Sequence, residues 1–133
     1  MIVSLHVATG AAGGAIVRSR LGAVPLGWLL HLAGDRMPHE DIPSRRFEIA
    51  SGLALLGLIA FRRGPFHPAT VGAIAASTPD LEHVFRFPQP GGRKLFPSHR
   101  LEHWHRSGGV PAAAQLLAAG FLVGLVIAPR RPS

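Results

Sequence analysis

Five stretches without a charged side chain make up most of this chain, and they restrict its fold more than any other feature. They cover residues 1–17, 21–34, 49–61, 64–79 and 107–129 of the 133 residues. Each stretch is apolar, and none shows the alternation of apolar and polar residues that is typical of a half-buried strand. We therefore expect one all-α domain over residues 1–133, built as a bundle of about five helices.

Turn-forming residues indicate where these helices begin and end. The pattern predicts helices over about 2–18, 22–37, 46–62, from about 69 onward, and 110–128, with a short helix over 99–106. Pro25 falls in the first turn of the second helix, where proline is tolerated. Pro79 either kinks the fourth helix or starts a new one.

Charged residues form only 16% of the chain, and the basic ones stand in short clusters between the apolar stretches. The net charge is +7, but no basic stripe runs along a predicted helix, so we expect no nucleic-acid partner. Arginine pairs that flank apolar segments are typical of membrane helices, and a spanning helix needs about 20 apolar residues. These patterns predict an integral membrane protein with lipid as a partner, a spanning helix over 110–128 and a shorter one over 49–61. A helical domain with a basic surface outside the membrane is an alternative.

Six of the eight histidines lie in three short segments that also contain acidic residues. These segments are 31–39, 79–83 and 99–105. Within them the side chains recur at a spacing of three or four, which places them on one face of a helix. Imidazole and carboxylate are ligands of zinc and related divalent metals, and the chain has no cysteine to offer instead. The segments therefore predict a His/Asp metal site, with Zn²⁺ or another divalent metal, at one end of the bundle.

His31 and Asp35 are the best-supported pair. They lie one helical turn apart at the end of the second predicted helix, and His39 follows Pro38. A helix C-terminus attracts a histidine through its dipole, but it disfavours an aspartate. Asp35 is therefore explained by metal binding, or by a role as the hydrogen-bond partner that orients His31. For His39, both metal binding and an interaction with the helix dipole stay open.

Asp80 and His83 form the second pair, three residues apart. An acid in a first helical turn also interacts favourably with the helix dipole, so Asp80 alone does not require a metal. Its position at the edge of an apolar stretch favours pairing or metal binding. A lone histidine in an apolar helix is usually a hydrogen-bonded core residue, yet His6 is a further candidate ligand.

The third segment offers His99 and His103, four residues apart, with His105 nearby. Whether His103 or His105 is the ligand stays open. Glu102 is a candidate general base, and Arg100 is placed to bind an anionic oxygen. Trp104 is typical of an anchor at a membrane interface.

The order of these motifs resembles the bacterial membrane-bound metal-dependent hydrolases and, more remotely, zinc-dependent phospholipase C. The resemblance covers residues 6–105 and rests on His6, the 31–39 segment, Pro79-Asp80 and His99-Arg100. The family's Pro-Asp-x-Asp segment has a second aspartate where this chain has Glu82. The family's Gly and Thr-His-Ser after His-Arg are replaced here by residues 101–104.

The resemblance implies metal-dependent hydrolysis of a phosphoester or lipid ester at the bacterial inner membrane. The metal ligands would come from His6, His31, Asp35, His39, Asp80, His83, His99 and His103. Metal-activated water would attack the ester, and Arg100 would steady the anion. The alternative is a membrane protein without enzyme activity, which binds a metal or has a structural role.

Overall fold

The computed structural model describes the chain apart from residues 85–93, 101–103, 105–107 and 130–133. Among the described residues the regular structure is helical, which confirms the all-α prediction. The elements are α1 (Val3–Val17), α2 (Arg20–Arg36), α3 (Arg45–Arg63), α4 (Pro68–Ser77), the 3-10 helix η1 (Thr78–Asp80), α5 (Leu81–Val84), α6 (Pro97–Arg100) and α7 (Ala112–Ile127). The five longer helices correspond to those that the charge-free stretches predict.

Side-chain caps begin several of these helices. The hydroxyls of Ser19 and Ser44 accept backbone N–H groups in the first turns of α2 and α3. The cap at Ser19 starts α2 two residues earlier than expected. Pro25 therefore lies inside the helix rather than in its first turn. Pro68 starts α4 at the position where a proline costs no hydrogen bond.

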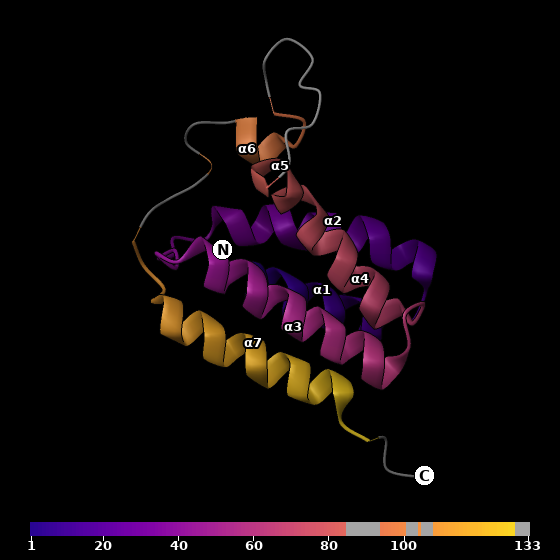
Figure 1. Cartoon of the computed structure of the whole chain (residues 1–133). Coiled ribbons are helices and arrows are strands. Elements are labelled where there is room, and N and C mark those ends of the chain that lie inside the picture. Colours follow the sequence, from indigo (N-terminus) through magenta and orange to yellow (C-terminus); the bar gives the residue numbers. More distant parts are fainter. Residues whose placement is uncertain (85–93, 101–103, 105–107, 130–133) are drawn as a thin grey trace.

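Helix α1 is the centre of the bundle and packs against α2, α3, α4 and α7 (Figure 1). Its contact with α4 is especially close, because glycines from both helices meet there. A Cβ atom on Gly10 would lie 2.3 Å from the carbonyl oxygen of Gly72. The absence of side chains at this crossing lets the two backbones touch and sets the position of the end of α4.

Gln115 of α7 ties three segments together at the N-terminal end of α1. Its buried amide accepts the N–H of Ile2 and donates to the carbonyls of Glu40 and Val110. Val110 and the loop after α2 also exchange backbone hydrogen bonds, in an isolated bridge with His39. These bonds hold the loop after α2 beside the start of α1. The short helices α5 and α6 lie at one end of the bundle (Figure 1).

The expected membrane spans are not found. In the part of the chain that the structure describes, no helix is both long and apolar enough to cross a membrane. The segment expected over 110–128 forms α7, whose 16 residues span about 24 Å. A bilayer core is about 30 Å thick. Helix α3 has 19 residues, but Arg45, Arg46, Glu48, Arg62 and Arg63 lie within it. The prediction of an integral protein of the bacterial inner membrane is therefore wrong.

Candidate metal centre

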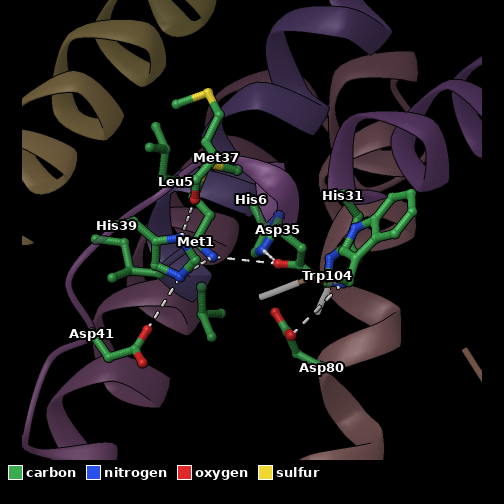
Figure 2. A network of polar contacts seen from close by, with 12 residues as sticks. Met1, Leu5, His6, His31, Asp35, Met37, His39, Asp41, Asp80 and Trp104 are labelled. Atoms are coloured by element: carbon green, nitrogen blue, oxygen red, sulfur yellow. Dashed lines mark hydrogen bonds and ion pairs between the residues drawn. The ribbon is translucent and has the colours of Figure 1, made fainter. Parts of the chain in front are cut away.

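Five of the predicted site residues come together at one end of the bundle, from four different elements. His6 comes from α1, His31 and Asp35 from the end of α2, Asp80 from η1, and His99 from α6. Figure 2 shows the carboxylates of Asp35 and Asp80 directed toward the ring of His31. These side chains form two overlapping groups that could hold a metal ion: His6, His31 and Asp35, and His31, Asp80 and His99.

The orientation of His31 is set by the end of α4. Its Nδ1 lies 2.8 Å from the carbonyl oxygen of Ala76, and a carbonyl only accepts, so Nδ1 is the donor. In the neutral ring Nε2 then carries a lone pair, and this atom lies 3.0 Å from Oδ2 of Asp35. Neither atom has a hydrogen-bond partner among the described residues, although both are buried. A cation between them, or a proton on Nε2, would satisfy both atoms.

Asp35 is held in place by His6. The two side chains are buried, and Nε2 of His6 lies 3.0 Å from Oδ1 of Asp35. Burial lowers the pKa of His6 to about 3, so its ring is neutral and donates this hydrogen bond. Burial alone would raise the pKa of Asp35, but the rings of His31 and His6 outweigh it and hold that pKa below its usual range. Asp35 is therefore a carboxylate whose second oxygen is directed at His31.

Asp80 completes the same cluster from the other side. Its Oδ1 lies 4.0 Å from Nε2 of His31 and 3.9 Å from Nε2 of His99. Burial raises the pKa of Asp80 to about 7, against the opposing effect of His31 and with a further contribution from Asp35. A buried carboxyl of this kind is stabilised as a carboxylate by a bound cation.

The pKa of Asp80 leads to a prediction about stability. Replacing Asp80 with asparagine is expected to stabilise the metal-free protein at pH 8 and to change it little at pH 4. The unfolded chain releases this proton near pH 4, whereas the folded chain keeps it to about pH 7, so stability falls as the pH rises between these values. The difference between wild type and Asp80→Asn reaches up to about 4 kcal/mol at pH 8. Thermal unfolding in EDTA at both pH values measures it, and an equal effect at the two pH values would contradict the assignment.

His99 is oriented by an acid that the sequence did not single out as a site residue. Its Nε2 lies 3.7 Å from Oδ2 of Asp35, and its Nδ1 lies 3.5 Å from Oε2 of Glu82. The carboxylate of Glu82 also accepts the N–H groups of Leu95 and Phe96 and so is fixed itself. A carboxylate behind a histidine is the usual second partner of a metal-binding imidazole. The sequence signal that could have identified Glu82 is its place two residues after Asp80 in the Pro-Asp-x-Glu segment.

Two predicted ligands lie outside the cluster. His39 is buried beside the α-amino group of Met1, with its Nε2 3.3 Å from Asp41 and its Nδ1 donating to the carbonyl of Met37. The exposed His83 contacts Lys94 and stacks edgewise on His99. Neither belongs to the two groups that could hold a metal ion.

The predicted catalytic residues have other positions. Arg100 is exposed and does not line the pocket at the cluster. Glu102, His103 and His105 lie outside the described residues, so their predicted roles stay predictions. Trp104, expected at a membrane interface, donates from its indole to the carbonyl of Leu32 and lies under the guanidinium of Arg36.

The cluster opens into a pocket of about 210 Å³. Asp35, Asp80 and His99 line it, whereas His6 and His31 stand behind them. Its other lining residues are Met1, Val3, Asp41, Arg45, Glu48, Ile49 and His83. Sequence reasoning missed Arg45 and Glu48, although Glu48 is the one acid in α3. Burial raises the pKa of Glu48, against the opposing hydrogen bond from the N–H of Val3.

Comparison with protein-family models, curated proteins and solved structures gives no match to this chain.

Proposed function

We propose that this chain is a metal-dependent hydrolase that cleaves a phosphoester or a lipid ester with water activated by a divalent metal. The observation that carries the proposal is that ligand atoms of two overlapping groups lie close to one another beside a pocket. They include Nε2 of His31, Oδ2 of Asp35, Oδ1 of Asp80 and Nε2 of His99.

The spacing of these atoms fits zinc. Tetrahedral ligands with bonds of 2.0–2.2 Å lie roughly 3.4 Å from one another. The separations between a histidine nitrogen and a carboxylate oxygen in the cluster are 3.0, 4.0, 3.7 and 3.9 Å. Two imidazoles and two carboxylates are also a donor set that zinc accepts. Three of them can serve as ligands while one coordination position stays open, as catalysis requires.

Three of the four ligands have a neighbour that orients them. The carbonyl of Ala76 holds His31, His6 holds Asp35, and Glu82 lies behind His99. Such support keeps a site rigid enough for chemistry. A metal in this position would supply hydroxide near neutral pH and polarise the ester. Glu48, which lines the same pocket and has a raised pKa, is suited to take up a proton there.

Hydrolysis of chromogenic esters tests the proposal. Zinc-loaded protein is expected to hydrolyse bis(p-nitrophenyl) phosphate or p-nitrophenyl acyl esters, and EDTA is expected to remove the activity. His99→Asn should lower kcat/KM about 100-fold, because removing even an indirect partner of a metal costs 10- to 100-fold.

His67→Asn is the matched control. His67 caps the opposite end of α4 by accepting the N–H of Ala69, and asparagine can replace it in that role. Activity that both variants retain equally would contradict the assignment of the site.

A metal-binding protein without enzyme activity is the second candidate. It is favoured by the charge of the pocket, which has four acidic side chains and one arginine among its lining residues: Asp35, Asp41, Glu48, Asp80 and Arg45. Such a surface attracts cations and repels anionic esters. Stoichiometric metal without hydrolysis of any tested ester would favour this candidate.

A further inference from the structure

A second pocket adjoins the metal centre and has a different chemistry. It measures about 190 Å³ and lies between α1, α3 and the segment from α4 to α5. Val3, Ile49 and Asp80 line both pockets, so the two share a wall at the cluster. The second pocket therefore lies next to the ligand atoms, on the other side of Asp80 or beside it.

The lining of this pocket is apolar. Beyond the shared residues, side chains from four elements form it: Val7, Leu53, Leu56, Ile74 and Leu81. The two hydroxyls that also line it, on Ser77 and Thr78, both donate to carbonyls of α4. Apart from these two hydroxyls and Asp80 at the shared wall, the lining has no polar side chain among the described residues. An apolar group gains from leaving water here, and a polar group does not.

The geometry points to an ester with an unbranched alkyl or acyl group of about six carbons as the substrate class, with that group in the apolar pocket. A cavity of about 150 Å³ is enough for benzene, so the volume fits a group of this size. This inference rests on the proposed hydrolase function, because that function places the ester group at the metal centre. The adjoining pocket then explains how a substrate binds beside a surface rich in carboxylates.

Binding of alkylphosphonates to the zinc-loaded protein tests the inference without turnover. Each methylene that leaves water raises the affinity by up to about fourfold. Hexylphosphonate is therefore expected to bind at least about tenfold more tightly than methylphosphonate in calorimetric titrations, with butylphosphonate between them.

Two tryptophan variants on α3 locate the alkyl group. Leu53 lines the pocket and is 62% exposed, so Leu53→Trp should fold and fill it. This variant is expected to bind hexylphosphonate about tenfold more weakly while methylphosphonate binding stays the same. Leu58→Trp, on the same helix but not in the lining, should change neither affinity.

The outcomes separate the two proposals. Equal binding of both phosphonates, or equal loss of both in Leu53→Trp, would overturn the apolar pocket as the substrate site and leave the hydrolase proposal standing. Preference for hexylphosphonate without any ester hydrolysis would contradict the hydrolase proposal, and with it the ester as substrate, and would leave the apolar pocket only as a site for an alkyl group. Binding of neither phosphonate to protein that contains zinc would contradict both.

Discussion

Replacing Asp35 with asparagine is expected to lower the affinity for zinc by about 100-fold or more. Indirect partners of a metal contribute 10- to 100-fold, and Asp35 contributes an oxygen directly. Its Oδ2 lies 3.0 Å from Nε2 of His31 and 3.7 Å from Nε2 of His99. Its negative charge is therefore close to both histidines of the proposed site. Competition with a chromogenic zinc chelator measures the change.

Asp41→Asn is the control for this variant. Asp41 lines the same pocket, but its side chain is 72% exposed and it contacts His39 rather than the cluster. It should change the affinity for zinc by only a few fold, through the lost charge at the pocket. Equal losses in the two variants would mean that the pocket binds cations by its overall charge and not through Asp35.

Placing alanine at Gly10 is expected to destabilise the protein by about 3 kcal/mol or more, at the upper end for overpacked cores. The new Cβ would lie 2.3 Å from the carbonyl oxygen of Gly72 and 2.6 Å from Cβ of Ala76. A backbone carbonyl cannot rotate away as a side chain can, so α1 and α4 must move apart to relieve the clash. The separation would also move the carbonyl of Ala76 that orients His31. Urea unfolding of the variant measures the loss.

Gly57 on α3 is the control position, where alanine is expected to stabilise the protein. A Cβ at this position meets nothing within 4 Å among the described residues. Gly57→Ala should therefore stabilise the protein by about 0.5–1 kcal/mol, because alanine favours the helix more than glycine. If the alanine variants of Gly10 and Gly57 were destabilised by the same amount, the close packing of α1 against α4 would not explain the loss of stability at Gly10.

The sequence predicted the helices well, because local signals determine them. The charge-free stretches and the turn-forming residues between them are such signals. The expected starts at 22, 46 and 69 were one or two residues late, because Ser19 and Ser44 cap α2 and α3 and Pro68 begins α4. The pair His31 and Asp35 was also predictable, since a spacing of four residues on a helix brings two side chains together. The meeting of this pair with Asp80 and His99 depends on tertiary packing, as does the proximity of Glu48 and Glu82.

The membrane prediction failed for a physical reason. An apolar helix is surrounded either by lipid or by other helices, and composition does not distinguish these cases. The two expected spans differ from membrane helices in length or in charge. Helix α7 has only 16 residues, and the 19 residues of α3 include four arginines and one glutamate. Both helices still expose large apolar side chains, such as Phe61 and Phe121.

The most direct test of the metal centre is an anomalous diffraction map of zinc-loaded crystals, recorded at the zinc absorption edge. We expect a peak 2.0–2.2 Å from Nε2 of His31 and Oδ2 of Asp35, with Asp80 and His99 as the remaining ligands. A peak only beside His39 and Asp41 would contradict it. So would a cluster without a peak, in which a protonated His31 bonds Asp35 directly.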